Sequence, residues 1–114
     1  YGYPLKDYDT KQILALNEDS MYQAWMNEKH VFEQSYIIEE KNQVVHGFMD
    51  FVVYKENEII IVDFKTDTVN NEQELIELYT IQLQTYKQAM KKITDLPIKT
   101  YIYSFSLSKC IYLE

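Results

Sequence analysis

Apolar and polar residues recur with helical spacing in three stretches of the chain. Residues 9–16 and 19–26 combine this spacing with polar first residues, which predicts two short helices. Residues 71–93 predict one long amphipathic helix, because inward-facing positions recur every three or four residues until residues 95–97 end the pattern. The positions predicted to face inward are Leu75, Leu78, Tyr79, Gln82, Leu83, Tyr86, Ala89, Met90 and Ile93.

Five other stretches are rich in β-branched and aromatic residues and are bounded by turn residues, as strands are. The predicted strands are residues 31–40, 43–54, 58–65, 98–105 and 109–114. The resulting order, α-α-β-β-β-α-β-β, indicates a mixed α/β fold. Because no linker, repeat or low-complexity segment interrupts the order, we expect residues 1–114 to form a single domain.

The second and third strands form a predicted hairpin that concentrates charge at one end. A two-residue turn at Glu56–Asn57, or a four-residue loop in the same register, places Asp50 opposite Asp63. Side chains alternate along strands, so Asp50, Asp63 and Lys65 share one face. The other face is predicted to be a core formed by Met49, Phe51, Val53, Ile60, Val62 and Phe64.

Two carboxylates on directly opposed residues destabilise a sheet, because their Cβ atoms lie about 4.5–5.5 Å apart. Solvent at the end of the hairpin, the ammonium of Lys65 or a divalent cation could each relieve the repulsion between Asp50 and Asp63. Mg²⁺ favours one or two carboxylates together with water and phosphate oxygens. The pattern therefore favours a metal site, with a solvated charge cluster as the alternative.

The composition limits the classes of function. A net charge of −7 argues against a domain that holds nucleic acid by charge alone. Cys110 is the only cysteine, which excludes an internal disulfide and a cysteine metal cluster. No apolar run approaches the about 20 residues that span a bilayer. Lys87, Lys91 and Lys92 form the one basic cluster, which we interpret as a solvated helix face rather than a DNA contact.

Three motifs together resemble those of the PD-(D/E)XK nuclease superfamily, whose fold is restriction-endonuclease-like. Asp50 in "GFMD" matches the first acid, and "DFK" supplies Asp63 and Lys65. The later "QLQTY", with Gln82 and Tyr86, is similar to the Q-L-x-x-Y helix of the RecB-like branch. The nearest likeness is to the C-terminal nuclease domain in the A subunit of AddAB-type (RexAB) helicase–nucleases.

This resemblance implies metal-dependent hydrolysis of DNA phosphodiesters. Asp50, Asp63 and the backbone carbonyl of Phe64 are expected to hold Mg²⁺, for which Mn²⁺ should substitute. Lys65 is expected to position the nucleophile or to stabilise developing negative charge. Gln82 and Tyr86 lie beside this site in the family, whereas their spacing alone would also fit a strand cap and a core residue.

The resemblance also implies partners: DNA, a helicase portion of the same polypeptide and a second nuclease subunit, in the bacterial cytoplasm and not in a membrane. The branch usually begins with a G-T-x-x-H-type helix that this sequence does not contain. We therefore expect a fragment of a longer exonuclease-bearing chain acting in double-strand break repair and recombination, and the isolated fragment could be inactive. A silent docking or DNA-guiding module and a stand-alone nuclease of another branch remain the alternatives.

Four further residues have weaker interpretations. Glu33 fits a supporting acid and a strand-surface residue equally well. His46 is on the predicted face of Asp50, but four strand residues span roughly 13 Å, too far to share one ion. Thr66 and Asp67 follow the triplet and are interpreted as turn residues or as the entry to the long helix.

Overall fold

The computed structural model describes residues 10–114 and begins with two short helices, α1 (Thr10–Glu18) and α2 (Ser20–Met26). Asp19 separates them and caps α2, because its carboxylate accepts a hydrogen bond of 2.9 Å from the Tyr22 backbone N–H. The predicted start of the first helix at residue 9 lies outside the described residues.

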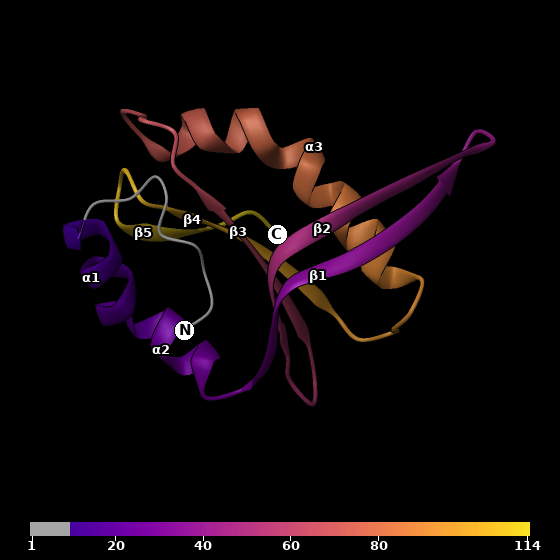
Figure 1. Ribbon diagram of the computed structural model, residues 1–114, viewed down its shortest axis with the longest axis horizontal. Coiled ribbons are helices and arrows are strands. Elements are labelled where there is room, and N and C mark those ends of the chain that lie inside the picture. The colour runs from indigo at the N-terminus through magenta and orange to yellow at the C-terminus, as the bar shows by residue number, and fades with distance from the viewer. Residues whose placement is uncertain (1–9) are drawn as a thin grey trace.

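Five strands form one mixed sheet in the order β1-β2-β3-β4-β5 (Figure 1). Only the β3–β4 pair is parallel, and α3 connects these two strands across one face of the sheet. The predicted order of elements and the mixed α/β fold class are confirmed. The strands are β1 (Lys29–Glu40), β2 (Gln43–Tyr54), β3 (Ile59–Lys65), β4 (Ile98–Ser104) and β5 (Lys109–Tyr112).

The long helix α3 (Glu72–Lys91) has favourable residues at both ends. The Asn71 side chain accepts a hydrogen bond of 3.1 Å from the Glu74 backbone N–H, so it caps the helix. Glu72 and Glu74 in the first turn and Lys91 in the last turn complement the helix dipole. None of the helices in residues 10–114 is long and apolar enough to cross a membrane.

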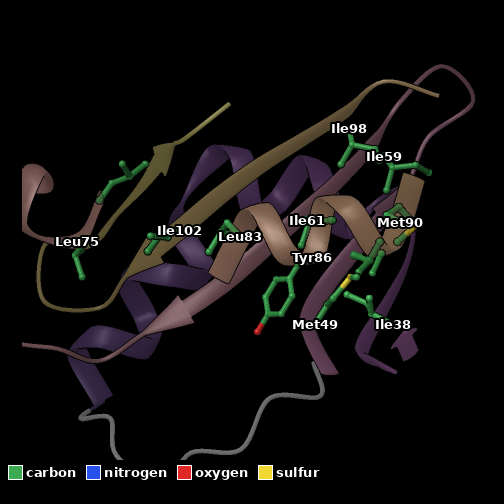
Figure 2. Packing of buried hydrophobic residues seen from close by; sticks show 13 residues of the cluster. Ile38, Met49, Ile59, Ile61, Leu75, Leu83, Tyr86, Met90, Ile98 and Ile102 are labelled. Carbon is green, nitrogen blue, oxygen red and sulfur yellow. The ribbon is translucent and has the colours of Figure 1, made fainter. Parts of the chain in front are cut away.

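Helices cover both faces of the sheet, and each face has its own core. The core beneath α3 is mainly aliphatic and includes Ile61, Leu83 and Met90 (Figure 2). The core beneath α1 and α2 is largely aromatic and centres on Phe51, which is fully buried. Because β3 lies between the two cores, its seven residues are buried except for Lys65, which is partly exposed.

The predicted register of the β2–β3 hairpin is confirmed. Tyr54 pairs with Ile59 and the ladder continues to Phe51 and Val62, where it ends. The Lys55 N–H donates to the Glu58 carbonyl across the turn at 3.0 Å. The first residues beyond the ladder are therefore Asp50 on β2 and Asp63 on β3.

One predicted core position was assigned to the wrong face. Met49 packs in the cluster beneath α3, not in the aromatic cluster with Phe51. Glu33, which stands beside Asp50 on β1, has a left-handed backbone (φ 55°) and is missing from the β1–β2 ladder. The register is the same on both sides of Glu33, so no residue is inserted, and the left-handed backbone interrupts the strict alternation of side chains at this point.

Two positions of the long helix were also predicted incorrectly. Leu78 is 61% exposed and Ile93 is 75% exposed, although both follow the same three- and four-residue spacing as the inward-facing residues. Ile93 lies beyond the last residue of α3, so helical spacing no longer directs its side chain. Leu78 follows the periodic pattern but lies at the edge of the stripe, because Leu75, Leu83, Tyr86, Ala89 and Met90 already fill the buried face.

The aromatic core gives a direct test of stability. Replacing Phe51 by alanine removes ring contacts with Tyr22, Trp25, His30, Phe32 and Phe64, whose centroids lie 4.7–6.3 Å away. Phe51→Ala should lower the free energy of unfolding in urea by about 3–5 kcal/mol. Ile81→Ala, at a position 79% exposed on α3, is the control and should change it by less than about 0.5 kcal/mol. Equal effects of the two variants would contradict the assigned core.

Candidate active site

Two carboxylates meet where the β2–β3 ladder ends. Asp63 is 2% exposed and belongs to a central strand that is covered by α3. Asp50 is half-buried, and its side chain is in hydrogen-bonding contact with that of Asp63. The hairpin therefore brings the two predicted acids together on the α3 face of the sheet.

The backbone of Phe64 completes this arrangement from the β3 side. Its N–H donates a hydrogen bond of 2.9 Å to Asp50 Oδ2. The N–H and the carbonyl of one strand residue point to the same side of the strand. The Phe64 carbonyl is therefore directed towards Asp50, which is the orientation that the predicted metal site requires.

Lys65 supplies the positive charge beside the carboxylates. Its Nζ lies 2.8 Å from Asp63 Oδ2 and donates a hydrogen bond of 2.9 Å to Gln82 Oε1. Nζ also lies 3.9 Å from the centre of the Tyr79 ring, a cation–π contact. The lysine side chain is only 16% exposed, so most of it is shielded from water.

Burial sets the electrostatics of the carboxylate pair. Desolvation, together with the hydrogen bond to Asp63 and the charge of Asp63, raises the pKa of Asp50 to about 8. The Phe64 N–H and the Lys65 ammonium oppose this increase without cancelling it. At neutral pH Asp50 is therefore mostly protonated.

The same pair fits a divalent cation. Asp63 Oδ2 is buried and accepts no hydrogen bond from residues 10–114, because the Lys65 contact is an ion pair outside hydrogen-bonding geometry. Within those residues, no group of three or more His, Cys, Asp or Glu side chains is arranged to hold a metal. Two carboxylates and one carbonyl remain, and Mg²⁺ accepts such a partial set because it retains several water ligands.

Gln82 and Tyr86 reach the site from α3, four residues apart on the same face. Gln82 binds Lys65 instead of capping a strand end. Tyr86 is 5% exposed and belongs to the aliphatic core (Figure 2), yet both Asp63 and Asp50 contribute to the raised pKa of its hydroxyl after the larger effect of burial. Tyr86 is therefore a core residue whose hydroxyl lies close enough to both carboxylates for their charges to raise its pKa.

Tyr79, Asp67 and Tyr36 lie beside the site, although the sequence did not predict a site role for them. Tyr79 contacts Lys65 through its ring and donates a hydrogen bond of 2.7 Å from its hydroxyl to Asp67 Oδ2. Asp67 was interpreted from the sequence as a turn residue or as the entry to the long helix. Tyr79 lies three residues before Gln82, and this spacing was the available signal for it.

Tyr36 has no local signal in the sequence, because a long-range contact places it. Its ring meets the Tyr86 ring at a centroid distance of 5.5 Å, and Asp63 adds to the burial that raises the pKa of its hydroxyl. The ring lies across Gly47 on β2. A Cβ at Gly47 would be 2.6 Å from the Tyr36 hydroxyl, so this crossing depends on glycine.

Glu33 stands beside Asp50 on β1, whereas His46 lies farther out on β2 and the lysine cluster lies around the end of α3. Glu33 is exposed, and no metal-binding group among residues 10–114 includes it. His46 is exposed on the outer part of the hairpin and contacts the Phe48 ring at a centroid distance of 5.7 Å. Lys87 pairs with Glu114 at 3.8 Å, while Lys91 and Lys92 are exposed.

The sequence matches a family model for the PD-(D/E)XK nuclease superfamily over residues 4–109. The chain belongs to this superfamily. Its mixed five-stranded sheet with flanking helices is consistent with the restriction-endonuclease-like fold of these nucleases, which generally use divalent metal ions.

Curated relatives of this PD-(D/E)XK chain are named as the A subunit of an ATP-dependent helicase/nuclease. The protein from Syntrophomonas wolfei is 37% identical over 71 residues, which are 60% of this chain. The proteins from Clostridium acetobutylicum and Clostridium botulinum strain 657 are 33% and 30% identical over 68% of the chain. In each case the match covers 6% of the relative's length.

The raised pKa of Asp50 predicts a pH dependence of stability. The unfolded chain releases this proton near pH 4, whereas the folded chain keeps it until about pH 8. Between these values the folded state binds more protons, so this contribution to stability is full below about pH 4 and is lost as the pH rises through about 8. In urea titrations with EDTA, the stability of the wild type relative to Asp50→Asn should therefore fall from about pH 5 to about pH 8.

The asparagine variant is a close control, because its amide oxygen can still accept the Phe64 N–H. It removes the titrating group but keeps its shape. A stability difference that does not change with pH would show that Asp50 ionises normally in the folded protein.

Proposed function

We propose that this chain is a metal-dependent deoxyribonuclease domain that hydrolyses phosphodiester bonds. The observation that carries the proposal is the buried pair of Asp50 and Asp63 with Lys65 in direct contact. Such a pair destabilises the sheet by repulsion and desolvation, and a divalent cation would relieve both. Membership of the PD-(D/E)XK superfamily supports the same reaction class.

Asp50, Asp63 and the Phe64 carbonyl would hold Mg²⁺, or Mn²⁺ in its place. When bound, such an ion supplies Lewis acidity and positive charge next to the scissile phosphate. The Phe64 N–H fixes the orientation of Asp50, and the β4 neighbours of β3 fix Asp63. The protein therefore provides two rigid carboxylates on adjacent strands, and few side chains need to reorganise on binding.

Lys65 would orient the attacking water or stabilise negative charge that develops on the phosphate oxygens. Its hydrogen bond to Gln82 directs the ammonium from the α3 side, and Tyr86 excludes water from the same side by packing in the core. Gln82 would therefore help to set the position of the lysine ammonium, and Tyr86 would limit the access of water to the site.

The names of the relatives suggest a larger setting. We propose an exonuclease domain within an ATP-dependent helicase–nuclease that acts in double-strand break repair and recombination in the bacterial cytoplasm. The helicase portion of that polypeptide and a second nuclease subunit would hold DNA. A net charge of −7 favours this division, since this chain has little positive surface with which to bind a polyanion.

The first test is a calorimetric titration of the chain with Mn²⁺, with Asp63→Ala for comparison. Saturable binding to the wild type should be lost in Asp63→Ala, because the most buried ligand is gone. The variant should stay folded, because alanine relieves the repulsion between the carboxylates. Its free energy of unfolding in EDTA should equal or exceed that of the wild type above about pH 8, where the ionised form of Asp50 predominates in the folded wild type.

Cleavage of DNA with and without Mg²⁺ completes this test. The wild type should cleave only with metal, and Lys65→Gln should lower the rate by about 10²–10⁴-fold while leaving Mn²⁺ binding intact. Metal binding without cleavage would favour a domain that guides DNA, and absence of both would favour a docking module. Unfolding of Asp63→Ala would show that Asp63 is structural.

A further inference from the structure

Within residues 10–114, three groups contact the Lys65 ammonium, and one of these three is a carboxylate. Asp63 approaches from β3 at 2.8 Å, Gln82 accepts a hydrogen bond at 2.9 Å and the Tyr79 ring centre lies at 3.9 Å. An ammonium has three N–H donors and no acceptor. Two of the three contacts therefore come from α3, and these do not depend on the charge of Asp63.

Tyr79 is itself fixed at the far end of its ring. Its hydroxyl donates to Asp67 Oδ2 at 2.7 Å, and this hydrogen bond is the largest cause that raises the pKa of Tyr79 to about 12. Asp67 follows Lys65 by two residues, in the connection between β3 and α3. The hydrogen bond therefore ties the start of this connection to α3 and presents the face of the ring to the ammonium.

The Asp63 carboxylate cannot pair closely with the Lys65 ammonium and bind a divalent cation at the same time without weakening one of the two interactions. If Asp63 holds a divalent cation, as proposed above, Lys65 loses its ion-pair partner and is repelled by the cation. A lysine with four rotatable bonds would then move towards solvent unless other groups held it. In the part of the chain that the structure describes, Gln82 and Tyr79 are in position to do so.

We propose that Tyr79, anchored by Asp67, is a positioning residue that holds the Lys65 ammonium independently of Asp63. The ring face and Gln82 fix two sides of the ammonium, and the third N–H is then available for a substrate or water oxygen. Tyr79 and Asp67 do not touch the reacting atoms in this arrangement and act only through Lys65. The catalytic consequence rests on the proposed nuclease function, whereas the contact between Tyr79 and Lys65 does not.

The test distinguishes the effect of the aromatic face of Tyr79 from the effect of the volume that its side chain fills. Tyr79→Leu fills part of the space without an aromatic face, and Tyr79→Phe keeps the face but loses the hydrogen bond to Asp67. Asp63→Ala removes the ion-pair partner and reproduces its absence without any metal. Far-UV circular dichroism and dispersed amide spectra would establish that each variant is folded.

The direct readout is the NMR signal of the lysine ε-methylene groups in ¹³C-labelled full chain, with Lys65 assigned by Lys65→Gln. A tyrosine face shields protons held over it, so the Lys65 signal should lie upfield of the other lysines in the metal-free wild type. The upfield position should persist in Asp63→Ala and in Tyr79→Phe, and it should vanish in Tyr79→Leu. A wild-type signal without shielding, or shielding lost in Asp63→Ala, would overturn the proposal.

Single-turnover cleavage at saturating Mg²⁺ provides the functional readout. Tyr79→Leu should slow cleavage about tenfold, with Mg²⁺ affinity by calorimetry unchanged. Tyr79→Phe should recover most of the rate, and Tyr112→Leu, at an exposed tyrosine on β5, should match the wild type. A parallel loss of Mg²⁺ affinity in Tyr79→Leu would show a structural role and overturn the proposal.

The two proposals fail in different ways. If no variant binds Mg²⁺ or cleaves DNA, the nuclease function fails, while the metal-free spectra still uphold or refute the Tyr79–Lys65 contact. If the wild type cleaves DNA and Tyr79→Leu cleaves equally fast, the nuclease function stands and the positioning role of Tyr79 is overturned.

Discussion

The repulsion between Asp50 and Asp63 is the constraint on which the rest of this structure depends. Water would screen two such carboxylates on the surface, but Asp63 is 2% exposed and lies beneath α3. Burial increases the cost of each charge and the repulsion between them. The fold limits this cost with a proton on Asp50, the hydrogen bond from the Phe64 N–H and the ion pair between Lys65 and Asp63.

Such a site needs a rigid frame, and the two cores provide it from opposite sides of β3. The aromatic core fixes Phe64 from below, and the aliphatic core fixes α3 above. Because the residues of β3 alternate between the two cores, Asp63 and Lys65 cannot rotate out of the α3 face without unpacking Val62 or Phe64. The burial of apolar residues thereby supports a polar arrangement that is unfavourable by itself.

The sequence predicted those parts of the molecule that local periodicity controls. The β2–β3 register followed from a short turn and a buried strand, and it correctly brought Asp50 and Asp63 together. The helical repeat likewise placed Gln82 and Tyr86 on one face of α3. Both follow from repeats of two or 3.6 residues, which do not depend on tertiary context.

The failures occur where tertiary contacts override the repeat. Met49 lies on the α3 face instead of the predicted face, next to the irregular position of β1 at Glu33. No sequence pattern predicts the left-handed conformation of Glu33. Tyr36 comes near Asp63 only because Gly47 lets its ring cross β2. The position of Tyr79 beside the site depends on its hydrogen bond to Asp67, twelve residues earlier, and on its contact with Lys65, which belongs to β3.

The charge of the site explains why a chain with a net charge of −7 can still be suited to phosphate chemistry. With Asp50 protonated, Asp63 and Lys65 form a neutral pair, so the metal-free site offers no net attraction to a phosphate. A divalent cation would displace the Asp50 proton, because the ionised carboxylate is the better ligand. Two carboxylates, one ammonium and one divalent cation then have a combined charge of about +1, so metal binding would convert a neutral site into one that attracts an anion.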